Sequence, residues 1–304
     1  WHFFFFLLHN LDLRGIPNSG GIWAPSLSYA NGKFYLIFTI VKTWKPFMPF
    51  KDLDNVLVTT DDLNGDWSEP IYLNSSGFDP SLFHDNDGKK WLVQMQWDYR
   101  KDKPRFGGIL LQEYSETERR LVGKPKKILQ KDRLIEGPNL YKHNDYYYLM
   151  LAEGGTGWEH SISMARCQTI DGEYELDPQD FVLTSKFNPE LYLQKAGHGE
   201  LVETQNGEWI LAHLASRPIG KNRDCILGRE TCLQKVVWNE EGWLRLEKGG
   251  NEPSENVEVN PPEYEFEKTA ERDDFDGETL DKSWNSLRVQ IDESWANLTE
   301  RKCF

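Results

Sequence analysis

The chain has 304 residues, of which 38% are hydrophobic and 13% aromatic, enough for one large domain, or a large and a small one, with a packed core. Its formal net charge of −14 at pH 7 argues against nucleic acid and against an anionic membrane surface as partners, because both attract clusters of Lys and Arg. The sequence has no run of 18 apolar residues, so we expect no transmembrane helix.

Both ends of the chain resemble interrupted elements. The first residues, "WHFFFFLLHN", lack an initiating Met, a basic segment and the small-residue cleavage site of a secretory signal. The last residues, "NLTERKCF", stop without a closing strand or turn. We therefore expect a fragment that is truncated at both ends, and the cellular compartment stays open.

From its first elements onward, the chain repeats one pattern about every 55 to 61 residues. Each copy has a polar or aromatic residue, a Pro or Gly, a short apolar strand, a turn with Gly, Asn or Asp, and a second, more apolar strand. Such turns between apolar runs are typical of β-hairpins. Strand-rich repeats without helical periodicity favour a β-propeller over a helical solenoid. The copies are "GIWAPSLSYANGKFYLIFT" from Gly21, "GFDPSLFHDNDGKKWLVQMQ" from Gly77, "IEGPNLYKHNDYYYLMLAE" from Ile135 and "GHGELVETQNGEWILAHLA" from Gly197.

The shared register of the copies predicts a common pocket. In a propeller the first strand of each blade lines the central channel, so residues at the starts of these strands converge at one end of it. Trp23, Asp79, Glu136 and His198 hold near-equivalent positions, within about one residue. The competing interpretation is that the two acids are ordinary turn residues, which are common before strands. Because four such residues share the register and two of them are acids, we favour the pocket.

Two carboxyl groups and a Trp in one pocket indicate carbohydrate chemistry. Two acids in different environments can divide the roles of proton donor and acceptor, and glycoside hydrolysis uses a carboxyl pair that flanks the scissile bond. The apolar faces of sugars can pack on aromatic rings. Trp97, Trp158 and Phe106 lie near the motifs and could form further subsite walls, although packing is the stronger interpretation for each one alone. We retain Trp97 as a substrate-binding candidate.

The four cysteines, Cys167, Cys225, Cys232 and Cys303, show none of the spacings typical of a zinc site. A disulfide between Cys225 and Cys232 stays open, but the sequence favours free, buried thiols. We therefore expect no zinc ion.

Six stretches together resemble glycoside hydrolase family 43, and in particular its two-domain β-xylosidases and α-L-arabinofuranosidases. In chain order they are "GGIWAPSLSY", "GFDPSLFHDNDG", "IEGPNLYK", "AEGGTGWEHSISMARC", "GHGELVET" and "LGRETCLQKVVW". The resemblance implies an all-β fold, with a five-bladed β-propeller over residues 1–250 whose first blade is largely missing. Residues 251–264, rich in Gly, Pro, Asn and Glu, are expected to form a linker. Residues 265–304 then resemble the beginning of a truncated, concanavalin-like β-sandwich.

The resemblance also implies an inverting mechanism on xylan-derived oligosaccharides and roles for five residues. Glu136 in "IEGP" matches the general acid, and Asp79 in "FDPS" matches the residue that raises the pKa of that acid and orients it. Arg229 in "GRET" and Trp23 in "IWAP" match substrate-binding residues. His198 in "GHGE" matches a channel histidine that lies beside substrate and a central ion or water cluster.

One part of the family pattern does not occur in this sequence. The family's general base is an Asp in a "PDPS"-type motif of the first blade, and residues 1–304 contain no such motif. Activation of water by a base typically contributes about 10²–10⁴-fold, so we expect an impaired enzyme. The alternative from another class is a non-catalytic carbohydrate-binding propeller. A retaining enzyme of the fructan-hydrolase type is disfavoured, because those relatives carry "RDP" and "EC" where this chain has "FDP" and "EGP".

The resemblance implies no required cofactor, and a structural calcium ion held through waters near His198 stays open. The expected partner is a xylo-oligosaccharide or an arabinoside, and the sequence does not decide between them. A homo-oligomer also stays open.

Overall fold

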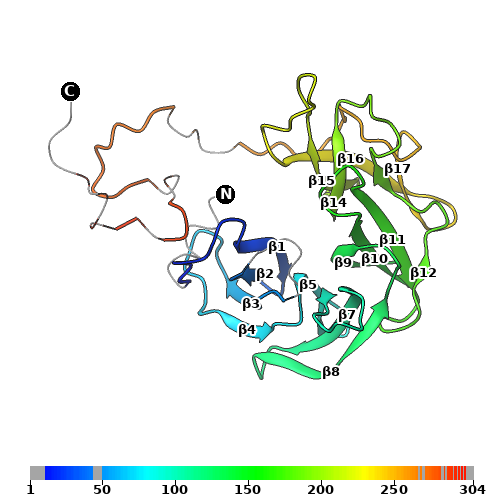
Figure 1. Cartoon of the computed structure of the whole chain (residues 1–304), viewed down its shortest axis with the longest axis horizontal. Coiled ribbons are helices and arrows are strands. Elements are labelled where there is room, and N and C mark those ends of the chain that lie inside the picture. Colours follow the sequence, from blue (N-terminus) through cyan, green and yellow to red (C-terminus); the bar gives the residue numbers. More distant parts are fainter. Residues whose placement is uncertain are drawn as a thin grey trace.

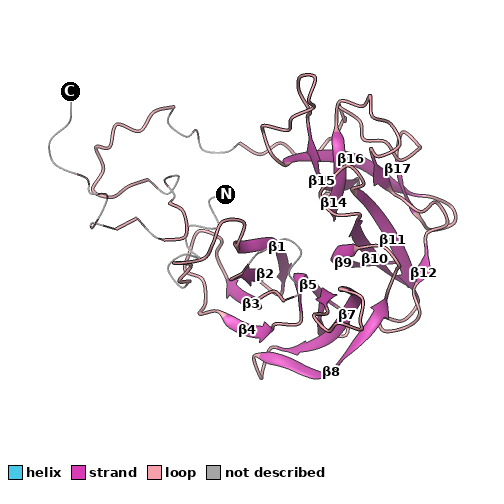
Figure 2. Cartoon of the chain, in the orientation of Figure 1, coloured by secondary structure: helices cyan, strands magenta, loops and turns pink. Residues whose placement is uncertain are grey.

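The computed structural model describes residues 11–43 and 50–265, together with residues 268, 271–281, 284, 286–289, 291, 292, 294, 296 and 298. All regular elements within these residues are β-strands, which confirms the all-β prediction (Figure 2). No helix in the described part of the chain is long and apolar enough to cross a bilayer.

The first two sheets are antiparallel meanders with strand orders β1-β2-β3-β4 and β5-β6-β7-β8. The first comprises β1 Gly21–Ala30, β2 Lys33–Val41, β3 Leu53–Thr60 and β4 Ile71–Asn74. The second comprises β5 Gly77–His84, β6 Lys90–Trp97, β7 Phe106–Ser115 and β8 Arg120–Leu129.

The third sheet has the order β12-β11-β10-β9, with β13 paired to β11, and the fourth has the order β14-β15-β16-β17. The third comprises β9 Ile135–His143, β10 Tyr146–Glu153, β11 Ser161–Cys167, β12 Glu175–Leu176 and β13 Leu183–Thr184. The fourth comprises β14 Gln194–Glu203, β15 Trp209–Ser216, β16 Glu230–Trp238 and β17 Leu244–Leu246.

The four sheets follow one another in a propeller-like arc, with β1, β5, β9 and β14 on its inner side (Figure 1). Each of these strands contacts the next, from β1 to β5, β5 to β9 and β9 to β14. The four hairpins predicted from the repeats are therefore the two inner strands of four consecutive sheets. The expectation of five blades stays a prediction.

The middle strands are largely apolar because each sheet packs face to face against its neighbours in the arc. In β10 every residue from Tyr148 to Glu153 is buried. One buried apolar cluster runs from Val41 in the first sheet through Met95 to Leu149 in the third, and a second joins the third sheet to the fourth. These clusters hold neighbouring sheets at fixed positions and so fix the inner strands that carry the motifs.

The outer strand β8 shows the opposite pattern. Its sequence "RLVGKPKKIL" is mostly exposed, and it carries several lysines and a proline, Pro125. Lysine and proline are common on edge strands because they discourage pairing with another chain.

Residues 251–264 have no regular secondary structure and run along the fourth sheet. Ser254 exchanges hydrogen bonds with Gln234, and Asn260 bonds to Asn206 and Glu208. Of residues 265–304, many lie outside the described residues, and those described form no strand. The linker and the start of a β-sandwich therefore stay predictions.

Candidate active site

Each inner hairpin has a shift of strand register at the repeated motif. At each shift one residue has a positive φ: 36° at Ala24, 53° at Asp79, 52° at Gly137 and 45° at His198. For residues other than Gly this conformation is costly, and three of the four positions precede a proline, which disfavours it further. Such strain persists only where the surrounding structure enforces it, so the bulges make the starts of the inner strands a candidate functional region.

The bulges refine the register that the sequence predicts. Asp79 and His198 occupy the positive-φ position itself, whereas Trp23 and Glu136 lie one residue before it. A bulge re-aims the side chains around it, so residues at both positions can serve one site. The four residues are therefore equivalent to within one residue, as predicted.

Two hydrogen bonds join β5 to β9 beside the acids. The backbone N–H of Gly137 donates to Oδ2 of Asp79 at 3.2 Å, and the hydroxyl of Ser81 donates to the carbonyl oxygen of Pro138 at 2.6 Å. The Asp79 side chain is almost completely enclosed, at 7% exposed. We call Asp79, Ser81, Glu136, Gly137 and Pro138 the β5–β9 seam.

The two carboxyl groups of the seam have raised pKa values. Burial raises the pKa of Glu136 above its usual range, and the negative charge of Asp79 raises it further. Burial also raises the pKa of Asp79, while the N–H of Gly137 and the charge of Arg229 lower it. Two adjacent carboxyl groups retain one proton in common near neutral pH. Since the Gly137 N–H stabilises the ionised form of Asp79, the shared proton belongs on Glu136.

His198 and Arg229 lie beside the seam. A Cβ at Gly137 would approach Nε2 of His198 to 2.7 Å, so the imidazole packs directly against this glycine. Burial, and next the charge of Arg229, lower the pKa of His198 to about 4, which keeps the ring neutral at pH 7. The Arg229 side chain is exposed, but its charge lowers the pKa values of Asp79, Glu136 and His198.

The predicted tryptophans surround Phe78, the residue before Asp79. The Trp23 ring meets Phe78 edge to face at 5.6 Å between centroids, and Trp97 lies 6.0 Å from Phe78. The indole N–H of Trp23 donates to the carbonyl of Ser19 at 2.9 Å. Phe106 packs edge to face on Trp97 at 5.6 Å, in agreement with the packing interpretation for this residue.

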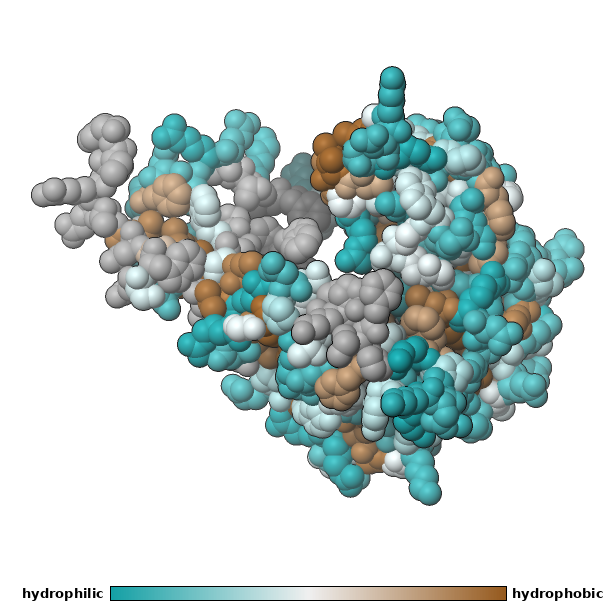
Figure 3. All heavy atoms as spheres, in the orientation of Figure 1, coloured by the Kyte–Doolittle hydropathy of each residue, from teal (hydrophilic) through white to brown (hydrophobic). Residues whose placement is uncertain are grey.

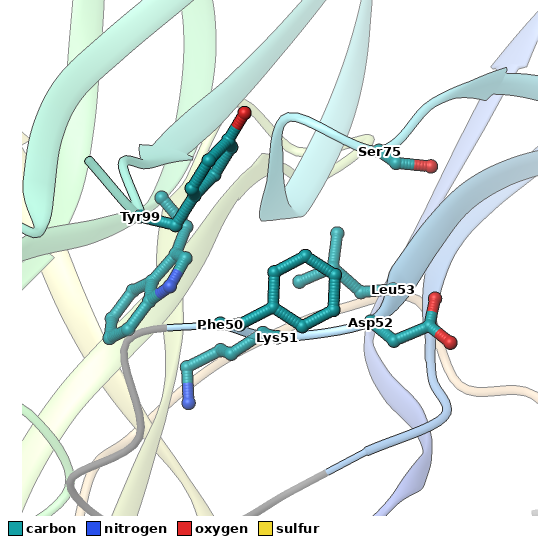
Figure 4. A pocket seen from close by; sticks show the side chains of 7 residues that line it. Phe50, Lys51, Asp52, Leu53, Ser75 and Tyr99 are labelled. Atoms are coloured by element: carbon teal, nitrogen blue, oxygen red, sulfur yellow. The ribbon is translucent and has the colours of Figure 1, made fainter.

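A cavity of about 100 Å³ opens beside Trp97, between the first and second sheets (Figure 4). The Nζ atom of Lys51 lies 4.4 Å from the Trp97 ring centroid, and burial lowers the pKa of Lys51 to about 8. Phe50 and Tyr99 are exposed and meet edge to face at 6.2 Å. We call this cavity the rim pocket, and it is lined by Phe50, Lys51, Asp52, Leu53, Ser75, Trp97 and Tyr99.

Sequence reasoning missed Ser81 and the rim-pocket residues Phe50, Lys51 and Tyr99. Ser81 belongs to the quoted "FDPS" motif, so the repeat could have identified it. The other three follow β2 or β6 in connections whose length and sequence differ between the copies, and no local pattern marks them. The described residues on the face of the molecule seen in Figure 3 are mostly hydrophilic, with small apolar patches.

The described cysteines Cys167, Cys225 and Cys232 are free thiols, as the sequence favours, but they are half-buried and not buried as expected; Cys303 lies outside the described residues. No group of three or more His, Cys, Asp or Glu side chains in the described ranges could hold a metal ion. Calcium near His198 therefore stays a prediction.

Comparison with known proteins gives one consistent family. The model of "Glycosyl hydrolases family 43" matches residues 8–244. A "Beta-xylosidase" of Bacillus subtilis (strain 168) is 49% identical over 302 residues, which are 95% of this chain and 56% of the relative. "Xylosidase/arabinosidase 43B" of Humicola insolens is 50% identical over 79% of this chain and 44% of the relative.

A solved structure, "xylan beta-1,4-xylosidase from Bacillus Halodurans C-125", superposes with a TM-score of 0.91 at 59% sequence identity. The superposition covers 96% of this chain and 56% of the solved one. The chain thus spans about half the length of the relatives it matches.

Proposed function

This chain belongs to glycosyl hydrolases family 43, and we propose that it carries the proton-donating side of a site that hydrolyses xylosides or arabinosides from xylan. The observation that carries the proposal is the β5–β9 seam. There, burial and the charge of Asp79 raise the pKa of Glu136, and Asp79 accepts a backbone N–H.

Glu136 acts as the general acid that protonates the leaving-group oxygen. A general acid must be protonated at the working pH, and burial together with the charge of Asp79 supplies this condition. The hydrogen bond from the Gly137 N–H holds Asp79 in place, so the negative charge of Asp79 continues to raise the pKa of Glu136. The reaction that these roles serve is the inverting one, in which a separate base activates water on the opposite face of the sugar.

The substrate-binding roles follow from the surroundings of the seam. Trp23 and Trp97 flank Phe78 and offer aromatic surface to a sugar ring, while Arg229 brings a positive charge that can bind hydroxyl groups. His198 is neutral at pH 7, so one ring nitrogen can accept a hydrogen bond from a hydroxyl or a water. Calcium held through waters at His198 is compatible with a neutral ring but is not needed for these roles.

We further propose that residues 1–304 by themselves catalyse the reaction poorly, because they contain no "PDPS"-type motif to supply the base. The absent contribution corresponds to about 10²–10⁴-fold in rate. The same observation favours a second candidate function, a propeller that binds carbohydrate without turnover.

The test is proton NMR of an aryl β-xyloside incubated with the full chain and, in parallel, with Glu136→Gln. α-Xylose as the first product supports inversion, and β-xylose contradicts it. Xylobiose binding without any turnover, in protein that is folded by circular dichroism, favours the binding propeller. A folded chain that neither binds nor hydrolyses xylosides and arabinosides would contradict both candidate functions, the hydrolase and the binding propeller.

A further inference from the structure

The connection between β15 and β16 comprises residues 217–229, and Arg229 is its last residue. Within the described part of the chain, Arg229 itself takes part in no hydrogen bond or ion pair, and its side chain is exposed. Its charge nevertheless acts on Asp79, Glu136 and His198. The orientation of Arg229 must therefore come from the connection that carries it.

Both sequence neighbours of Arg229 are held at the base of the connection. The guanidinium of Arg217 forms a bidentate ion pair with Glu230, in which Nε donates to Oε1 at 3.0 Å and to Oε2 at 3.1 Å, and Nη2 donates to Oε1 at 2.5 Å. On the other side, the hydroxyl of Ser216 donates to the carbonyl oxygen of Gly228 at 2.9 Å. A planar, two-pronged Arg–carboxylate pair restricts orientation more than a single bond does.

The tip of the connection is held from the third sheet. The guanidinium of Arg223 lies 4.5 Å from the centroid of Trp158 and donates to the carbonyl oxygen of Pro189 at 2.8 Å. Trp158 lies between β10 and β11 and also has Nζ of Lys195 at 4.6 Å from its ring centroid. A ring that already binds two cations is poorly placed to stack a sugar, so its contacts argue against Trp158 as a subsite wall.

We propose that Arg217 and the Arg223–Trp158 contact are positioning elements that hold the backbone around Arg229 and so keep its charge near the carboxyl pair. What Arg229 does there rests on the proposed function, but its placement does not. Releasing either anchor lets the connection move, and Arg229 then spends less time near Glu136. The contact acts through Arg229 and touches neither the acids nor the sugar.

The first measurement is the pKa of Glu136. It is determined from the ¹³C chemical shift of the Glu136 carboxyl group in a pH titration of the full chain. Removing a nearby positive charge makes ionisation harder, so Arg229→Ala raises this pKa. Trp158→Ala and Arg217→Ala should raise it in the same direction, while Trp158→Phe, which keeps a ring for Arg223, should restore it. Lys195→Met is the matched control, since it removes the other cation from Trp158 and leaves the connection in place.

The second measurement is xylobiose affinity by calorimetry. We expect Arg229→Ala to weaken binding by about tenfold, the loss of one charge-assisted hydrogen bond, and Trp158→Ala by a smaller factor. In the Arg229→Ala background, Trp158→Ala should have no further effect.

The outcomes separate the inference from the proposed function. An unchanged Glu136 pKa in folded Trp158→Ala and folded Arg217→Ala overturns the inference, whatever the sugar affinity. Shifted pKa values with no sugar binding by any variant uphold the positioning of Arg229 and contradict the proposed function. If Trp158→Ala does not fold, Arg217→Ala alone decides, because its ion pair is partly exposed and its loss costs little stability.

Discussion

The β5–β9 seam and the rim pocket both enclose ionisable side chains, but they hold these side chains in different ways. In the seam, Glu136 and Asp79 lie on two inner strands that are joined by hydrogen bonds of Gly137 and Ser81. In the rim pocket, Lys51 lies over the ring of Trp97, on a connection that leaves the sheet. The seam has geometry imposed by paired strands, whereas the rim has geometry set by side-chain packing.

From this difference we infer that the seam performs the proposed chemistry and that the rim pocket contributes to substrate selection. Burial raises the pKa of the seam carboxyls toward neutrality and lowers the pKa of Lys51 to about 8, so both regions favour the uncharged form. Only in the seam does a second carboxyl group reinforce the shift. A rigid strand pair suits proton transfer, and an open aromatic pocket suits contact with a variable sugar or leaving group.

The largest effect should be a loss of turnover on removal of the proposed proton donor in the seam. We expect Glu136→Gln to lower turnover of xylobiose by about 10²–10⁴-fold relative to the wild-type chain, with a smaller loss on aryl xylosides, whose leaving groups need less protonation. Rates are measured by product release. The exposed Glu173→Gln serves as the control and should have no effect. Wild-type rates on xylobiose in Glu136→Gln would show that another group donates the proton.

The next effect tests the packing of the seam. Gly137→Ala places a Cβ 2.7 Å from the His198 ring at a φ of +52°, so we expect about 1–2 kcal/mol from the backbone and about 1–3 kcal/mol more from the clash. Gly88→Ala is the matched control, because Gly88 has a φ of +86° and open space around its Cβ position. Urea unfolding compares the two. Equal losses in the free energy of unfolding would mean that the His198 ring moves aside without measurable cost.

A third, smaller effect is the pH dependence of stability at the seam. The folded chain binds protons at Glu136 and Asp79 more tightly than the unfolded chain, so its stability falls as pH rises from below the usual carboxyl range through the raised pKa values. The slope approaches about 1.4 kcal/mol per pH unit for each group that deprotonates. Glu136→Gln should flatten the profile, as measured by urea midpoints. A wild-type profile that is already flat contradicts the raised pKa values.

The smallest effect is the pH dependence of stability that arises from Lys51 in the rim pocket, and it has the opposite sign to that of the seam. The folded-state pKa of Lys51 is lowered to about 8 from 10.5, so the unfolded chain binds the extra proton and stability rises as pH increases from about 8 to 10.5. The slope should stay below that of the seam, because a lysine can extend its ammonium group toward water. Lys51→Met should remove this rise while leaving the seam profile unchanged. Urea midpoints, extended to alkaline pH, measure the stability profile of the wild-type chain and of Lys51→Met.

The seam could be predicted from the sequence because its information is local and repeated. Each copy places one motif before a hairpin, and hairpin pairing fixes which residues begin the inner strand. The register alone therefore indicated that Asp79 and Glu136 meet. It also placed the tryptophan motif within one residue of its observed position.

The rim pocket and the anchors of Arg229 could not be predicted in this way. Phe50, Lys51 and Tyr99 lie in connections that differ between copies, and the contact between Arg223 and Trp158 joins two sheets across 65 residues of chain. Such contacts depend on how the sheets pack, and hydrophobic periodicity carries no information about them.

The sequence by itself determined the all-β class, the four hairpins and the shared register of two acids, a histidine and a tryptophan, because periodicity and turn residues act over short distances. Only the tertiary structure decided that Gly137 occupies a positive-φ bulge against His198 and that its N–H donates to Asp79. The physical reason is that strain, burial and the sharing of one proton arise between strands that are distant in sequence.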